Sequence, residues 1–290
     1  MDIEGISGAA TVALASTLVF VLIARSWQLI HRALGGAGNF PGSIMREAAQ
    51  RFRDEFDRLG SSQSTYLSAS VMFAVLFVAA YALQAGQLFA GYPVWQLHIL
   101  LATLAAAALL AVLKMLRMVQ ARRRLRLRRD ANIAIGHQLH RLAAGVGRTY
   151  HDVDTPAGTL DHLAIGPSGA YAVSVFACPV NRNSKVSLHA HELSFGSGSK
   201  TCSLVATNAK IASLEREFRR LLDHRVRIRS VIAIPGWDIE AQNSDEHLMV
   251  NEKNLAMLSG WKDRSDFLLD EDVEALHGLL TERCTRRAWL

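Results

Sequence analysis

The stretch from Thr159 to Cys178 reads T-L-D-H-L-A-I-G-P-S-G-A-Y-A-V-S-V-F-A-C and decides the fold of the second half of this chain. Residues 160–165 alternate as a strand does, and residues 170–177 form a small, apolar, β-branched run. Between them, Gly166-Pro167-Ser168-Gly169 favours a tight turn. The pattern predicts a hairpin with Asp161 and His162 side by side in its first strand. A buried hairpin without a functional site is the simpler interpretation of the same pattern.

Further motifs follow the hairpin at intervals. Pro235-Gly236-Trp237 comes directly after the apolar stretch 231–234, and Val250-Asn251 is followed by Asn254-Leu255. Together with Asp161-His162 and the glycine-proline turn, this series resembles the nuclease-related domain (NERD) family of restriction-endonuclease-like PD-(D/E)xK folds, over roughly residues 130–260. The resemblance implies a helix, a strand with Asp-His, a turn, and a strand with Glu-x-Lys.

The resemblance also implies that two acidic side chains hold a divalent metal while a lysine orients the attacking water. Asp161 is the matching position in this chain, but Gly136-His137 stands at the helix glutamate and Ser174-Val175-Phe176 stands at Glu-x-Lys. A serine hydroxyl is a poor ligand for a hard cation, and phenylalanine cannot position a water. We therefore expect a catalytically degenerate domain, with His137, Ser174 and Phe176 as substituted catalytic positions.

An active metal-dependent nuclease is the alternative. Asp161 and His137, with His162 nearby, would then form a non-standard metal site, and histidine favours zinc or manganese over magnesium. The main expectation is a binding module for nucleic acid or for a cytoplasmic protein. No cofactor is expected for it; Mg²⁺ or Mn²⁺ enters only with the alternative, and no small-molecule substrate is evident.

The basic excess of the chain lies in its first part. The formal net charge is +6, and residues 1–129 carry 14 basic against 6 acidic side chains, whereas residues 130–290 carry 18 against 20. A slightly acidic domain argues against a broad phosphate-binding surface. The three cysteines are widely spaced and match no disulfide or zinc pattern, so reduced thiols are expected.

Three stretches are long and apolar enough to cross a bilayer. No charged residue lies between Glu4 and Arg25, and none lies from Leu59 to Leu113. The segments Q-A-G-Q at 84–87 and G-Y-P at 91–93 divide the second stretch into two. Spans are therefore predicted at about residues 6–24, 66–83 and 95–113. A cleaved signal peptide would begin with basic residues, and a buried soluble hairpin would show a polar face. The sequence has neither.

Charge asymmetry predicts the orientation of these spans. Residues 25–58 contain six arginines, and residues 114–129 contain eight basic residues and no acid. The amino terminus and the turn at 84–94 have no basic residue. Both basic segments are therefore expected on the cytoplasmic side, with the amino terminus and the turn outside. We expect a multi-pass protein of the inner (cytoplasmic) membrane with a cytoplasmic C-terminal domain.

The predicted organisation is a membrane region at 1–116, a basic linker at 117–129, a NERD-like domain at 130–265 and a C-terminal helix at 266–290. The first cytoplasmic loop contains an amphipathic helix at 42–59, which either lies in the lipid headgroups or docks on the domain. Arginines of the linker are expected to contact anionic lipid, with nucleic acid as the alternative. These arginines are Arg122, Arg123, Arg124, Arg126, Arg128 and Arg129.

Within the domain, the linker helix is expected to continue through residues 131–143. Strands are predicted at 186–190 and 192–195, and an amphipathic helix at 204–221. Arg225, Arg227 and Arg229 alternate along the next strand, where they form either a weak nucleic-acid contact or a solvated edge. Helix, strands, helix and returning strand predict an α/β fold: three N-terminal transmembrane helices followed by a mixed α/β, restriction-endonuclease-like domain.

Overall fold

The chain divides into two compact units. The computed structural model describes residues 3–34, 45–83, 93–143, 147–180, 184–189, 191–196, 200–244, 246–259 and 266–285. The first unit, here called the helical unit, comprises Met1–Phe40, Glu55–Arg124 and Ala288–Leu290. The second, here called the α/β domain, comprises Pro41–Asp54 and Leu125–Arg287. A short segment that precedes the predicted second span thus belongs to the α/β domain.

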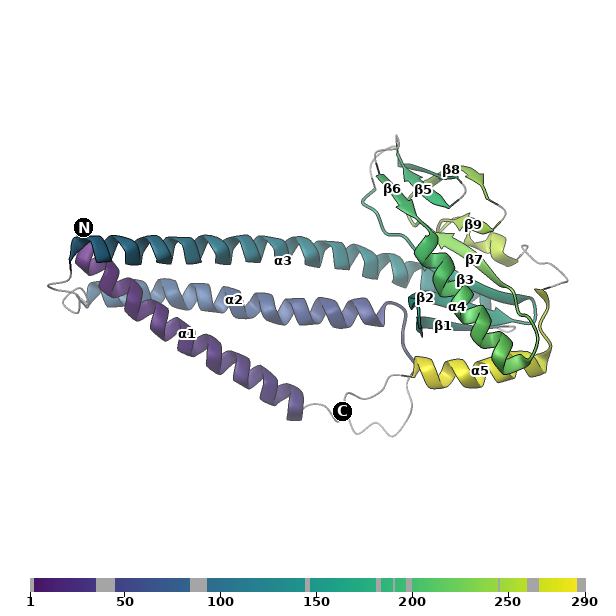
Figure 1. Cartoon of the computed structure of the whole chain (residues 1–290), viewed down its shortest axis with the longest axis horizontal. Helices are drawn as coiled ribbons and strands as arrows, with labels where there is room; N and C mark the ends of the chain where they lie inside the picture. The colour runs from purple at the N-terminus through teal and green to yellow at the C-terminus, as the bar shows by residue number, and fades with distance from the viewer. Residues whose placement is uncertain are drawn as a thin grey trace. The chain divides into compact units, whose positions relative to one another are not determined.

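The N-terminal half of the chain forms three long helices, which Figure 1 shows in purple, blue and teal. They are α1 (Ile3–Leu34), α2 (Gln50–Ala82) and α3 (Val94–Ala143). Stretches long and apolar enough to cross a membrane lie at Ile6–Trp27, Gln50–Ala80 and Val94–Ala143. The expectation of three membrane-spanning helices therefore agrees with the structure in number, length and apolar character.

Two of these helices extend well beyond the predicted spans. In α2, the end of the amphipathic loop and the second span form one continuous helix. In α3, the third span, the basic linker and the first helix of the domain are continuous, which confirms the predicted extension to Ala143. Between Pro93 and Gly136 the sequence has neither glycine nor proline, so nothing in it interrupts the helix.

The α/β domain is built on a five-stranded sheet with the order β1-β2-β3-β7-β9. The first three strands form an antiparallel meander, and β7 and β9 run parallel to β3. The predicted hairpin is β2–β3, and Gly169 after its turn has a φ of +118°, which favours glycine. The strands are β1 (Arg148–Thr155), β2 (Gly158–Gly166), β3 (Gly169–Val175), β7 (Ile228–Ala233) and β9 (His247–Val250).

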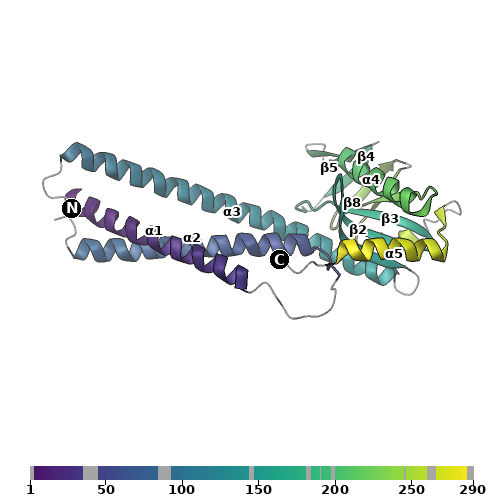
Figure 2. The ribbon, with the colours of Figure 1, turned by 60° about the horizontal axis from the view of Figure 1, so that its bottom comes forward.

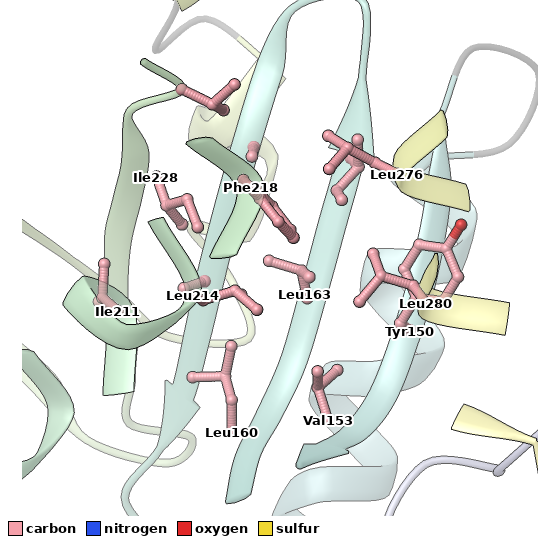
Figure 3. Packing of buried hydrophobic residues seen from close by; sticks show 14 of the residues in the cluster. Tyr150, Val153, Leu160, Leu163, Ile211, Leu214, Phe218, Ile228, Leu276 and Leu280 are labelled. Atoms are coloured by element: carbon pink, nitrogen blue, oxygen red, sulfur yellow. The ribbon is translucent and has the colours of Figure 1, made fainter. Parts of the chain in front are cut away.

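Helices cover both faces of this sheet (Figure 2). On one face, α4 (Val205–Leu222) and α5 (Asp270–Cys284) bury a core that includes Leu163, Leu214 and Leu280, shown in Figure 3. On the other face, Ile135 and Leu139 near the end of α3 pack on Val173 and Val231, together with the short helix η2 (Leu255–Ser259). The end of α3 is therefore a structural part of the domain.

A smaller sheet with the order β6-β5-β4-β8 packs beside the main one. Its strands are β4 (Lys185–His189), β5 (Glu192–Phe195), β6 (Lys200–Ser203) and β8 (Asp238–Asn243). Ile232 of β7, Met249 of β9 and Ile234, which follows β7, share a core with it. Trp237 joins the two, because its ring lies 5.1 Å from that of Phe195 and its Nε1 donates to the carbonyl of Cys178 at 3.2 Å.

Candidate functional site

Two dipeptides of histidine and aspartate meet on neighbouring strands. His151-Asp152 lies in β1 and Asp161-His162 lies in β2, and the register pairs His151 with His162. Their Nδ1 atoms are 2.8 Å apart, so one ring donates a hydrogen bond to the other. β1 was not predicted from the sequence, because its residues R-T-Y-H-D-V-D-T are largely polar. The structure thus adds His151 and Asp152 to the predicted site.

The regular alternation of both strands is interrupted at these dipeptides. Leu160 and Leu163 belong to the same core, as do Tyr150 and Val153, although residues three apart in a strand point to opposite faces. Asp152 has a φ of +50°, a backbone conformation that residues other than glycine rarely adopt. Irregularities of this kind re-aim side chains and are frequent next to functional sites.

The histidines face the end of α3 at Gly136. A Cβ atom on this glycine would lie 3.4 Å from Cε1 of His162 and 3.5 Å from Cε1 of His151. His162 is fully buried, and its Nε2 has no hydrogen-bond partner among the described residues. We call His151 and His162 the His pair.

Burial keeps the His pair neutral. Burial is the main cause and the charge of His140 the second, and together they lower the pKa of His151 to about 4. Burial also lowers the pKa of His162 well below its usual range, with His151 as a second cause. A neutral imidazole can be a hydrogen-bond donor at one nitrogen and an acceptor at the other, which is what the short contact between the rings requires.

Asp161 has both carboxylate oxygens engaged within its own chain. Oδ2 accepts a hydrogen bond from the amide of Val175 at 2.8 Å, and Oδ1 accepts one from the guanidinium of Arg51 at 3.2 Å. Burial raises the pKa of the carboxyl group, and the contacts with Val175 and Arg51 oppose that shift. The cation beside Asp161 is therefore an arginine of the same chain.

The segment that supplies Arg51 docks on β1. Residues 45–54, here called the docked segment, begin with the amide of Arg46 donating to the carbonyl of Cys284 at 2.8 Å. Arg46 Nη1 donates to the carbonyl of Asp152 and to Oδ2 of Asp154, both at 2.7 Å. The amide of Arg51 donates to Oδ2 of Asp152 at 2.9 Å. Of the two expected positions of the amphipathic loop, docking on the domain is observed for these residues.

Asp152 is the buried centre of this docking. It is 1% exposed, and its Oδ1 has no partner among the described residues. Burial raises the pKa of its carboxyl group, while the amide and charge of Arg51 lower it. The sequence contains a signal that would have found it, since the order His-Asp in 151–152 mirrors Asp-His in 161–162.

Of the positions expected to be substituted, Ser174 and Phe176 flank Val175, whose amide contacts Asp161, and His137 lies on α3. Ser174 is buried in β3, and Phe176 packs against the core beneath the smaller sheet. His137 is exposed on α3, one residue after the buried Gly136. Among the described residues, three possible metal ligands lie close together: His191, Glu246 and His247. The predicted metal pair of Asp161 and His137 does not belong to this group.

The three arginines predicted to contact nucleic acid have different surroundings. Arg225 and Arg227 are exposed and line a pocket of about 460 Å³, here called the arginine pocket, together with Glu246 and His247. Arg229 also borders the pocket, but its Nε donates to Oδ2 of the buried Asp266 at 2.6 Å. The structure therefore leaves two arginines directed to solvent and uses the third in an internal ion pair.

The arginines of the basic linker also differ from one another. In the helical unit, Arg122 donates to Oε1 of Gln63 at 3.0 Å, and its guanidinium lies 4.3 Å from the ring centre of Phe56. In the α/β domain, Arg129 pairs with Asp130 at 2.8 Å. The remaining four are exposed: Arg123, Arg124, Arg126 and Arg128.

The other motifs behind the resemblance form a single turn structure. Nδ2 of Asn251 donates to the carbonyl of Trp237 at 3.1 Å. Its Oδ1 accepts from the amides of Lys253 and Asn254, both at 3.0 Å. Gly236, with a φ of +81°, lies where a Cβ atom would be 2.8 Å from Val180. These residues therefore have a structural role.

Comparison of the chain with protein-family models, with curated proteins and with solved structures finds no match. The likeness to the nuclease-related domain family therefore stays a resemblance of motifs. Function has to be inferred from the side chains of this protein and from their contacts.

Proposed function

We propose that this chain is a membrane-anchored binding protein whose α/β domain is a catalytically degenerate relative of the nuclease-related domain. The proposal rests on one observation, which is that both carboxylate oxygens of Asp161 are engaged by groups of the same chain. Its oxygens accept hydrogen bonds from Arg51 and from the amide of Val175. In a nuclease of the implied kind, a divalent metal would take the position beside this carboxylate.

The order of elements supports the proposed relationship. The resemblance implies a helix, a strand with Asp-His, a turn and a second strand, followed by a helix and a returning strand. The chain has α3, β2, the turn at 167–168, β3, α4 and β7 in that order, and β7 lies parallel to β3. Fold alone does not define activity, so the missing side chains decide between enzyme and binding module.

The contacts of Asp161 disfavour hydrolysis. Binding a metal there would require displacing a guanidinium that already neutralises the carboxylate. The neighbouring side chains cannot compensate, because Ser174 is a weak ligand for a hard cation and Phe176 has no donor or acceptor. An arginine that replaces the metal preserves the charge balance of the site and removes the Lewis acid.

Nucleic acid is the partner that the arginine pocket favours. Arg225 and Arg227 are exposed beside a cavity large enough for a phosphate group and its sugar. A guanidinium binds phosphate oxygens in a bidentate manner. The domain as a whole is slightly acidic, so we expect a few local phosphate contacts with a single strand.

We expect the membrane anchor to hold this binding activity at the cytoplasmic surface of the inner membrane. Support comes from three membrane-spanning candidates and from the basic residues that follow the first and third of them. With an odd number of spans, an amino terminus outside puts the α/β domain in the cytoplasm.

The absence of hydrolysis is tested on the full-length protein in detergent. Labelled single-stranded and double-stranded DNA and RNA are incubated with Mg²⁺, Mn²⁺ or Zn²⁺, with Asp161→Ala as the control for contaminating nucleases. We expect the two proteins to give the same background. Cleavage by the unaltered chain that disappears in Asp161→Ala would establish the active nuclease instead.

Binding is tested by fluorescence anisotropy with a labelled single strand over a series of salt concentrations. Replacing Arg225 and Arg227 by alanine removes two phosphate contacts, so the slope of log K against log salt should become shallower by about 1.4. Replacing Arg219 and Arg220, which are exposed on α4, makes the same change in net charge and should leave the slope nearly unchanged. Equal effects of the two double variants would show that the phosphate contacts are not made by Arg225 and Arg227 in particular. No salt-dependent binding would overturn the nucleic-acid assignment and point to a protein partner.

A further inference from the structure

We propose that His191, Glu246 and His247 form a zinc site that joins the smaller sheet to the edge of the main sheet. One ligand atom from each of these residues lies within 4.8 Å of the other two. His191 lies in the turn between β4 and β5, Glu246 precedes β9, and His247 is the first residue of β9. The site is separate from Asp161 and does not depend on nucleic-acid binding.

His247 is held as a metal ligand would be. Its side chain is 1% exposed, and Nδ1 lies 2.7 Å from Oγ of Ser230 on the neighbouring strand β7. Nε2 is buried and has no hydrogen-bond partner among the described residues. An imidazole whose second nitrogen is fixed by a hydrogen bond is the usual arrangement around protein-bound metals. Nε2 can therefore offer its lone pair to a metal ion.

The other two ligands are exposed and able to close on an ion. Nδ1 of His191 lies 3.8 Å from Oε2 of Glu246, and the rings of His191 and His247 are nearly perpendicular with centres 5.9 Å apart. Zinc bonds of about 2.0–2.1 Å place tetrahedral ligand atoms about 3.3 Å apart. If the exposed side chains of His191 and Glu246 rotate so that their ligand atoms move by about 1 Å, the three atoms reach that spacing.

The ligand set selects the kind of ion. Two imidazoles and one carboxylate suit zinc and related transition metals, whereas Mg²⁺ and Ca²⁺ prefer sites made of oxygen. Zinc binds imidazole in its neutral form, so binding should weaken at acid pH.

Three protein ligands leave a fourth position open. Glu246 and His247 also line the arginine pocket with Arg225 and Arg227. Water or an anionic oxygen can complete the coordination from that side. The position of the ligands also implies a structural effect, because an ion bound by His191 and His247 ties the β4–β5 turn to β9.

The test uses the untagged full-length protein in detergent, stripped with a chelator and dialysed against a slight excess of Zn²⁺. Bound zinc is then measured by mass spectrometry, and Co²⁺ is added in parallel to record the visible spectrum of a low-symmetry site. We expect one bound ion per chain and a rise in thermal midpoint with zinc concentration. His191→Ala and Glu246→Gln should abolish both effects, and both substitutions are at exposed positions that leave the core intact.

His189→Ala is the matched control, since this histidine is exposed on the same hairpin and lies outside the proposed ligand set. It should bind zinc as the unaltered chain does. Ser230→Ala should weaken binding about 10–100-fold through loss of the contact with His247. If the unaltered chain retains no zinc, or if His191→Ala and Glu246→Gln bind it as tightly as His189→Ala, the site does not exist.

Discussion

Gly136 is the residue on which three parts of the α/β domain converge. A Cβ atom there would lie 2.6 Å from Cβ of Ala48 in the docked segment, in addition to its contacts with the His pair. Glycine inside a helix costs about 1 kcal/mol relative to alanine. Close packing of the docked segment against α3 offsets that cost, and it is possible only without a side chain.

Gly136→Ala should therefore destabilise the domain by about 1–3 kcal/mol, as overpacking generally does. Gly278 of α5 is the matched control, because a Cβ atom at that position meets nothing within 4 Å. Gly278→Ala should raise stability by roughly 0.5–1 kcal/mol. Thermal denaturation followed by circular dichroism compares the two. A stabilising effect of both substitutions would show that the docked segment does not lie against Gly136.

The His pair makes stability depend on pH. Burial lowers the pKa of His151 from 6.5 to about 4, so below pH 6.5 the unfolded state binds a proton that the folded state rejects. Stability should therefore fall as the pH decreases from 6.5 toward about 4, by roughly 2 kcal/mol at about pH 5 from His151 alone. His162, whose pKa is also depressed, adds to the loss.

Asp152 and Asp161 act in the opposite direction, because their raised pKa values let the folded state bind protons first at the acid end. Thermal midpoints measured across this pH range show whether the histidines or the aspartates dominate the change in stability. His151→Asn should flatten the profile, whereas His189→Asn, at an exposed position, should leave it unchanged. Parallel profiles for all three proteins would mean that the His pair titrates normally.

At the scale of elements, the docked segment is held by a small number of identifiable contacts. Ala49 and Phe52 are buried, and Arg46 and Arg51 reach β1 and β2. Ala49 has a φ of +63°, which turns the chain just before α2 begins. A domain that starts at residue 130 would lack all of these contacts, including those of Arg46 and Arg51 with β1 and β2.

Arg46→Ala should loosen this segment selectively. The side chain makes two hydrogen bonds, one of them to a largely exposed carboxylate, so we expect a loss of about 1–2 kcal/mol in local stability. Hydrogen exchange of peptides covering residues 45–54 and 148–155 should then accelerate about 5–30-fold. Arg58→Ala, on the exposed surface of α2, serves as the control. Unchanged exchange in both variants would contradict the observed docking.

At the scale of the whole molecule, the proposed orientation follows from charge asymmetry. An epitope tag at the carboxyl terminus should be protected from added protease in intact spheroplasts and be cleaved in inverted vesicles, and a tag at the amino terminus should behave oppositely. The physical reason is the six arginines at 25–58 and the eight basic residues at 114–129, which resist translocation. Cleavage of both tags from the same side would refute an odd number of spans.

Regular periodicity made much of the architecture predictable. The apolar runs of the N-terminal half, the β2–β3 hairpin and the helix at Val205–Leu222 follow from patterns within single segments. These signals are local, because a strand or helix that buries one face has apolar residues recurring at the period of that element. β1 was missed because its residues are largely polar and because Asp152 is held by Arg46 and Arg51, which lie more than a hundred residues earlier in the chain.

The sequence by itself determined the long apolar helices and the hairpin. Only the tertiary structure decided that Arg51 lies beside Asp161, that His151 meets His162, and that His191 approaches His247. The first and third pairings join segments that are far apart along the chain, and the second joins two neighbouring strands. These pairings depend on strand register and on helix packing in three dimensions, which no local pattern of residues encodes.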